Sequence, residues 1–120
     1  MENNSQNPFE NLDEQTKMEI QELQILEQSF QQLLMQKQAF SMELVETKNI
    51  VDAVEKSDGE ISRIVGNQVI IKTTKEKIIE EMKNKKNLIE KRLKNIDEQE
   101  EQFSKKSEEL REKILKKIQQ

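Results

Sequence analysis

The chain has 120 residues, of which 37% are charged and 32% are apolar, and its formal net charge is −4. It contains no Cys and no His, which excludes disulfides, thiolate zinc sites and Cys or His nucleophiles, so a metal site would need carboxylates alone. The low apolar content argues against a large compact core, whereas the ordered spacing of the apolar residues argues against disorder, and together they indicate long helices.

The first predicted element is a helix over residues 12–57, after an N-terminal segment, residues 1–11, that we expect to be flexible. Apolar residues recur at alternating spacings of four and three, as in a coiled-coil seam, and no Gly or Pro interrupts them. The predicted seam positions are Leu12, Thr16, Glu19, Leu23, Leu26, Phe30, Leu33, Lys37, Phe40, Leu44, Thr47, Val51 and Val54.

A segment of different character follows, and it predicts a β-hairpin over residues 61–73. We expect Gly59 to take the left-handed conformation that ends a helix. Two runs rich in β-branched residues, 61–65 and 68–73, then flank Gly66-Asn67, and Gly66 suits the first central position of a type II′ turn.

The last predicted element is a second helix over residues 74–118, opened by a capping box of Thr73 and Glu76. Its seam positions are Ile79, Met82, Lys86, Ile89, Leu93, Ile96, Glu100, Phe103, Ser107, Leu110, Ile114 and Lys117. Residues 1–60 carry a net charge of −9 and residues 61–120 one of +5, so the halves should attract. An antiparallel register that places Phe30 opposite Phe103 and Leu23 opposite Leu110 aligns the two seams.

The predicted fold is therefore mostly α: a single domain formed by a long antiparallel coiled-coil hairpin with one small β-hairpin at the bend. An isolated two-stranded hairpin is marginally stable in water, and this one is apolar on both faces, so we expect it to assemble with neighbours into a shared β-barrel platform. The predicted interface residues are Ile61, Ile64, Val65, Val69, Ile70 and Ile71.

At the opposite, free end of the coiled coil the seam becomes polar at Thr16 and Glu19, and we expect loose packing there. Such an end could contact many apolar sequences weakly. The candidate substrate-binding residues are Phe9, Met18, Ile20, Leu115 and Ile118, joined by Leu110 and Ile114 if the end opens. Scattered apolar surface residues are also ordinary in any protein, and this simpler interpretation stays open.

The stretch from Ile64 to Lys77, Ile-Val-Gly-Asn-Gln-Val-Ile-Ile-Lys-Thr-Thr-Lys-Glu-Lys, resembles β-type prefoldin subunits, most of all the archaeal kind, and the likeness extends over the whole chain. This resemblance implies a hexamer of two α-type and four β-type subunits whose hairpins form a double β-barrel. It also implies an ATP-independent chaperone without cofactors, which holds unfolded proteins between coiled-coil ends and delivers them to a group II chaperonin.

The main alternative is a structural scaffold that dimerises through its β-hairpin, and an enzyme is the least favoured class. Nucleic-acid binding is disfavoured because acidic residues interleave with the basic ones and stacking aromatic residues are lacking; the basic residues in question are Lys83, Lys85, Lys86, Lys91, Arg92 and Lys94. No apolar run approaches the roughly 18 residues of a membrane span, and residues 1–7 do not resemble a secretion signal. We therefore expect a cytoplasmic protein without membrane contact.

Overall fold

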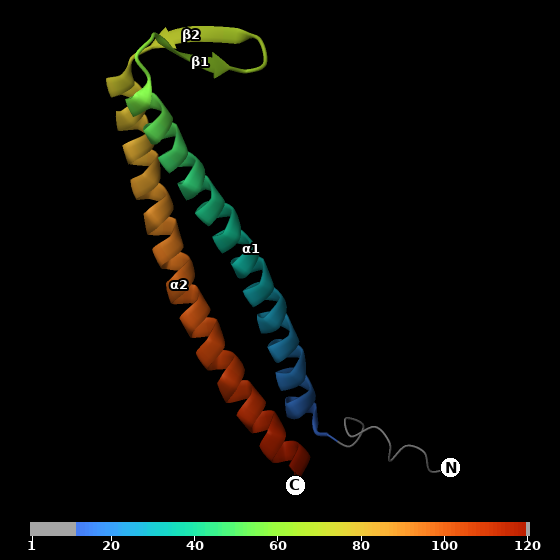
Figure 1. Cartoon of the computed structure of the whole chain (residues 1–120). Helices are drawn as coiled ribbons and strands as arrows, with labels where there is room; N and C mark the ends of the chain where they lie inside the picture. The colour runs from blue at the N-terminus through green and yellow to red at the C-terminus, as the bar shows by residue number, and fades with distance from the viewer. Residues whose placement is uncertain (1–11, 120) are drawn as a thin grey trace. The chain divides into compact units, whose positions relative to one another are not determined.

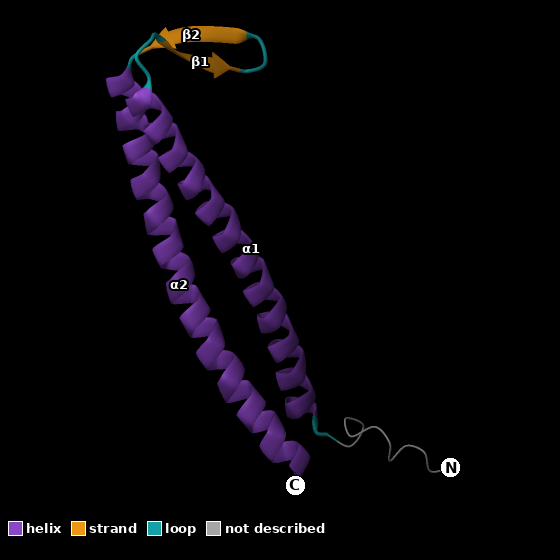
Figure 2. Ribbon diagram, viewed as in Figure 1, coloured by secondary structure: helices purple, strands orange, loops and turns teal. Residues whose placement is uncertain are grey.

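The computed structural model of the chain describes residues 12–119. Its elements follow one another as α1 (Glu14–Lys56), β1 (Ile61–Val65), β2 (Val69–Thr73) and α2 (Lys75–Gln119) (Figures 1 and 2). The predicted order of helix, hairpin and helix is confirmed. The N-terminal segment expected to be flexible, residues 1–11, lies outside the described residues.

The chain divides into two compact units, and both helices contribute to each. Of unit 1 the structure describes residues 12–35 and 96–119, which pair the first part of α1 with the last part of α2. Unit 2 comprises Gln36–Asn95 and pairs the last part of α1 with the first part of α2, joined by the β-hairpin.

The core of both units is the predicted seam. The buried apolar residues are Leu26, Leu33, Ile78, Ile89, Ile96, Leu110 and Ile114. All of them except Ile78 occupy predicted seam positions, and every predicted seam position of α1 is buried or half-buried. Of the predicted seam positions in α2, only Lys86 and Lys117 are exposed. Burying the ammonium group would cost hydration free energy, whereas the long side chain can extend and keep that group in water.

Polar contacts between the helices establish their antiparallel order in each unit. In unit 1, Lys117 and Lys106 form ion pairs with Asp13 and Glu22, at 3.0 and 3.1 Å, so the order along α2 is the reverse of that along the first part of the chain. A further ion pair of the same unit joins Arg111 to Glu27 at 2.7 Å. In unit 2, Arg92 stacks over the Phe40 ring at 5.6 Å from its centroid. Near the hairpin, Lys75 Nζ donates to the carbonyl oxygen of Glu55 at 3.4 Å.

The helix ends differ in three details from the prediction. Gly59 does not have a left-handed backbone; α1 ends earlier, at Lys56, with the Ser57 N–H donating to the Val54 carbonyl at 3.2 Å. At the start of α2, Thr74 is the cap, because its hydroxyl accepts the Lys77 N–H at 3.2 Å. Thr73 cannot serve, since it is the last residue of β2 and faces Ile61 in the ladder. The predicted capping box with Glu76 is therefore not formed.

The hairpin turn is one residue longer than predicted. Gly66 has a φ of 67°, as a residue opening such a turn requires, but Val65 faces Val69, so Gly66, Asn67 and Gln68 all lie in the turn. The prediction of a two-residue type II′ turn is therefore wrong. A physical reason lies in the pairing: the longer turn sets Val65 opposite Val69 and Ile64 opposite Ile70, whereas the shorter turn would put Gln68 opposite Val65.

Candidate interaction surfaces

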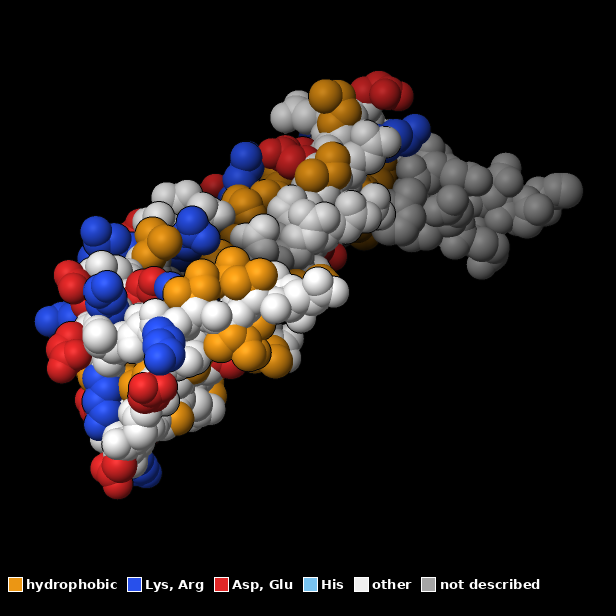
Figure 3. All heavy atoms as spheres, turned by 90° about the horizontal axis from the view of Figure 1, so that it is seen from above, with side chains coloured by type: hydrophobic (Ala, Val, Ile, Leu, Met, Phe, Trp, Pro, Cys, Tyr) orange, Lys and Arg blue, Asp and Glu red, His pale blue; other side chains and the backbone are white. Residues whose placement is uncertain are grey.

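The β-hairpin presents apolar side chains on both faces. Directly paired residues share a face, so Ile64 and Ile70 lie on one face, while Val65, Val69 and Ile71 lie on the other with Arg63. Ile64 and Ile70 are 72% and 71% exposed, and the three residues of the second face are each about half exposed. Figure 3, which views the molecule from above relative to Figure 1, shows that hydrophobic side chains are uncovered on the visible face.

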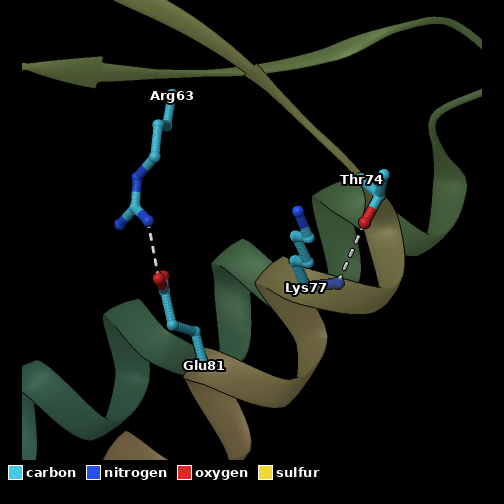
Figure 4. A network of polar contacts seen from close by, with 4 residues as sticks. All are labelled: Arg63, Thr74, Lys77 and Glu81. Carbon is cyan, nitrogen blue, oxygen red and sulfur yellow. Dashed lines mark hydrogen bonds and ion pairs between the residues drawn. The ribbon is translucent and has the colours of Figure 1, made fainter.

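Arg63 joins the second face of the hairpin to α2. Its Nη1 donates to Glu81 Oε1 at 2.6 Å, and this hydrogen bond raises the pKa of Arg63 (Figure 4). Thr74 follows β2 directly and caps α2, so it sets the residue at which the helix begins. This cap lies close to the Arg63–Glu81 contact. The face with Ile64 and Ile70 therefore points away from Glu81 and is the more accessible one.

The sheet also has two open edges. Within residues 12–119 it consists of β1 and β2 alone, so the outer edge of each strand has N–H and C=O groups without a ladder partner. Among the six predicted interface residues, five are exposed and Ile61 is half-buried. A sheet shared with neighbouring chains would pair the free backbone groups of these edges and cover the exposed apolar faces.

The candidate substrate-binding residues fall into two groups around the open end of unit 1, by which we mean residues 13–20 of the chain and 110–119. Met18, Leu115 and Ile118 are 64%, 54% and 39% exposed, and Ile20 is half-buried. Phe9 lies outside the described residues. The exposed residues are thus available for contact with another molecule.

Leu110 and Ile114 form the second group, and the structure buries both in the seam, at 6% and 7% exposure. Thr16, where we expected loose packing, is fully buried. The expectation of a loosely packed end is therefore wrong for the described residues. A small Thr fits between the helices, and the exposed Lys117 reaches outward to bond Asp13 instead of occupying the seam. Contact between Leu110 or Ile114 and a substrate would require the two helices to separate at this end.

Asp13 holds the open end together. Its Oδ1 accepts the Thr16 N–H at 2.7 Å, which caps α1, and its Oδ2 accepts Lys117 Nζ of α2 at 3.0 Å. The adjacent Thr16 hydroxyl, the Thr16 N–H and Lys117 together lower the pKa of Asp13 from 3.8 to about 2, although the hydroxyl has no hydrogen bond of good geometry. The sequence signal, an Asp three residues before a Thr at the start of an apolar repeat, was present but was not used in the prediction.

Unit 1 also contains a groove between its helices, with a volume of about 700 Å³. Its walls are mainly polar, and the Glu27–Arg111 ion pair belongs to them. Phe30 is the apolar residue in its lining. The groove is therefore poorly suited to an apolar substrate.

A third set of apolar residues, on the outer surface of α1, was missed by the sequence reasoning. Ile25, Met35, Met42 and Val45 are each more than half exposed. The signal was available, because all four fall off the predicted seam.

Two kinds of site were looked for in residues 12–119, a cluster of metal ligands and a membrane-spanning helix. Among residues 12–119 there is no group of three or more acidic side chains placed to hold a metal ion. In the same range, neither helix combines the length and the hydropathy that crossing a bilayer requires.

Comparisons with known proteins agree on one family. The family model described as "Prefoldin subunit" matches residues 17–120. The prefoldin subunit beta of Pyrococcus furiosus is 35% identical over 108 residues, which cover 88% of this chain and 92% of that protein. That of Methanosarcina acetivorans is 32% identical over 102 residues, covering 83% and 86%. The crystal structure of the prefoldin beta subunit from Thermococcus strain KS-1 has a TM-score of 0.82 and 31% identity to this chain, covering 92% of it and 97% of the other.

Proposed function

Because the chain belongs to the prefoldin subunit family, we propose that it is the β-type subunit of an ATP-independent chaperone that holds non-native proteins. In this proposal it assembles through its hairpin with an α-type subunit and further copies of itself, as two α-type and four β-type subunits. The complex works in the cytoplasm, captures unfolded proteins and passes them to a group II chaperonin. It performs no enzymatic reaction.

One observation carries the assembly step: the hairpin exposes large apolar side chains on a sheet of only two described strands. Ile64 and Ile70 are each more than 70% exposed. Burying a side chain of this size stabilises an assembly by about 1.5–3 kcal/mol, and adding strands at the open edges satisfies their free backbone groups. The hairpin is therefore the part of the chain with the most to gain from neighbours.

The capture step is assigned to the open end of unit 1, through Met18, Leu115 and Ile118 together with Phe9 and Ile20. Long, adaptable apolar side chains among charged ones can contact many unfolded sequences weakly. Several copies of such an end in one complex add strength, because each contact after the first is intramolecular. No nucleotide is needed for such contacts.

Co-expression with an α-type subunit tests assembly and function together. Native mass spectrometry should find a complex of two α-type and four β-type subunits, and this complex should suppress aggregation of a chemically unfolded protein without nucleotide. A chain that stays a homodimer beside its companion would favour the scaffold interpretation instead. An assembled complex that leaves aggregation unchanged at molar excess would contradict the chaperone function.

A further inference from the structure

Unit 2 contains a groove between α1 and α2 with a volume of about 470 Å³. Its lining combines an apolar floor with a charged rim. The apolar residues are Leu44, Val51, Ile79 and Met82; the polar and charged ones are Thr47, Lys48, Lys83, Lys86 and Glu90. Its volume falls within the range of about 300–1,000 Å³ that is usual for ligand pockets.

The groove exists because one layer of the seam lacks bulk. Thr47 and Lys86 both occupy seam positions and both line the groove. Thr47 is buried, and its hydroxyl turns back to donate to the Glu43 carbonyl of its own helix at 2.8 Å. Lys86 is exposed, so its side chain does not fill the seam. The neighbouring apolar residues of both helices, which are half-buried, are left as an open floor.

The rim carries an excess of positive charge. Lys48, Lys83 and Lys86 face a single carboxylate of the lining, Glu90, and none of the three lysines takes part in an ion pair within the described residues. In the groove of unit 1, by contrast, the one cation of the lining, Arg111, is paired with Glu27. The groove in unit 2 therefore joins an apolar floor to free cations, and the groove in unit 1 does not.

We propose that this groove binds acidic amphipathic segments of non-native proteins. Apolar side chains on one face of such a segment occupy the floor, where the flexible Met82 adapts to different shapes. Asp and Glu side chains on its flanks meet Lys48, Lys83 and Lys86, whose long stems allow them to follow carboxylates at varied positions. This inference rests on the proposed function, since it names a class of segment that the chaperone holds at a second place.

Fluorescence anisotropy of the full-length chain with two short labelled peptides tests the proposal. The first peptide has Leu and Phe at helical spacing among Glu and Asp; the second has Lys in place of every acidic residue. The acidic peptide should bind at least about tenfold more tightly, because charges of opposite sign meet at the rim. Its affinity should fall as NaCl is raised toward 1 M, where the screening length is about 3 Å.

Two double variants locate the site. Lys83→Glu with Lys86→Glu should weaken the acidic peptide at least about tenfold. Lys91→Glu with Lys94→Glu is the matched control, since it changes the net charge equally on the same helix at exposed residues outside the groove, and it should change the affinity by less than about twofold. Circular dichroism verifies that both variants keep their helices.

Three results would overturn the inference: equal binding of the two peptides, equal weakening by the two double variants, or displacement of the peptide by an equimolar single-stranded oligonucleotide. The last result would mark a general polyanion site. Failure here is distinguishable from failure of the proposed function, because a complex that suppresses aggregation yet does not bind the acidic peptide contradicts only the groove. A complex that binds the peptide but leaves aggregation unchanged contradicts only the chaperone function.

Discussion

At the level of single residues, Asp13 shows how one carboxylate ties two helices together. It caps α1 through Thr16 and also bonds Lys117 of α2, and both interactions favour its ionised form. Because the pKa in the folded chain is about 2, below the ordinary 3.8, the stabilisation is fully present above pH 4 and is lost as the pH falls toward 2.

We predict that Asp13→Asn lowers the melting temperature at pH 7 and that Asp13→Ala lowers it further, since Asn keeps a cap acceptor and Ala keeps neither interaction. The difference from the unchanged chain should shrink between pH 4 and pH 2. Thermal melts followed by circular dichroism measure both effects. Glu14→Gln, which removes the same charge one residue later, should have the smaller effect at pH 7; an equal effect would mean that charge near the helix start, and not the bonds of Asp13, is what matters.

The seam makes a sharper prediction at two adjacent residues of α2. Ile89 is 3% exposed and Leu88 is 50% exposed. Ile89→Ala should reduce the free energy of unfolding by about 2–4 kcal/mol, because it removes packed atoms and leaves a cavity. Leu88→Ala should cost less than about 1 kcal/mol. Urea unfolding at one protein concentration compares them, and similar costs would contradict the assignment of the core.

At the level of elements, the hairpin depends on the backbone of Gly66. A Cβ atom added at Gly66 or at Gly59 would meet no atom within 4 Å, so space is available at both. Gly66 alone has a positive φ, and Gly66→Ala should therefore cost the hairpin about 1–2 kcal/mol, whereas Gly59→Ala should be nearly neutral. Hydrogen exchange of the amides of residues 61–73 reports the difference. Equal exchange in the two variants would show that the turn does not need its left-handed residue.

The sequence predicted the helices well because a sustained repeat of apolar residues leaves few alternatives. It failed where one residue can serve two elements. Thr is a common helix cap, but Thr73 pairs with Ile61 in the sheet, and the neighbouring Thr74 caps α2 instead. Gly66-Asn67 has the composition of a two-residue turn, but pairing Val65 with Val69 decides the register. Ile78 was missed as a core residue because it lies beside the seam position of Ile79.

The candidate surfaces were predictable to different extents. Apolar strands of five residues without a covering element are visible in the sequence, and the hairpin indeed exposes them. At the open end the sequence could not tell which polar seam positions are enclosed. Thr16 is small enough to be buried, and that burial comes with the burial of Leu110 and Ile114 in the same unit.

At the level of the whole molecule, assembly should fail when the open face of the hairpin receives a charge. We predict that Ile70→Lys abolishes the complex with an α-type subunit while the helix content is unchanged, because a buried unpaired ammonium is very costly. Met42→Lys is the control, since Met42 is also well exposed but lies in α1. Sedimentation velocity separates the complex from single chains. An intact complex with Lys at position 70 would place the interface elsewhere.

Client holding should depend on the open end of unit 1. We predict that a triple variant with Ser at Met18, Leu115 and Ile118 still assembles but needs severalfold more complex to suppress aggregation, because each weak apolar contact is repeated in every copy. The control changes three exposed apolar residues of unit 2, Met42, Val45 and Ile50, to Ser. If the control loses as much holding as the triple variant, the capture site is not confined to the open end.

The polar layer of Thr47 and Lys86 also bears on how the chain avoids misfolding. A repeat of similar apolar layers could slide by seven residues and still bury most of its side chains. Such a slip would carry Lys86 among layers of Phe, Leu and Val and would leave a β-branched or aliphatic residue of α2 beside Thr47. The small Thr47 leaves Lys86 room to reach water, and a bulkier partner would leave less, so we expect this polar layer to disfavour the slipped pairing of the two helices.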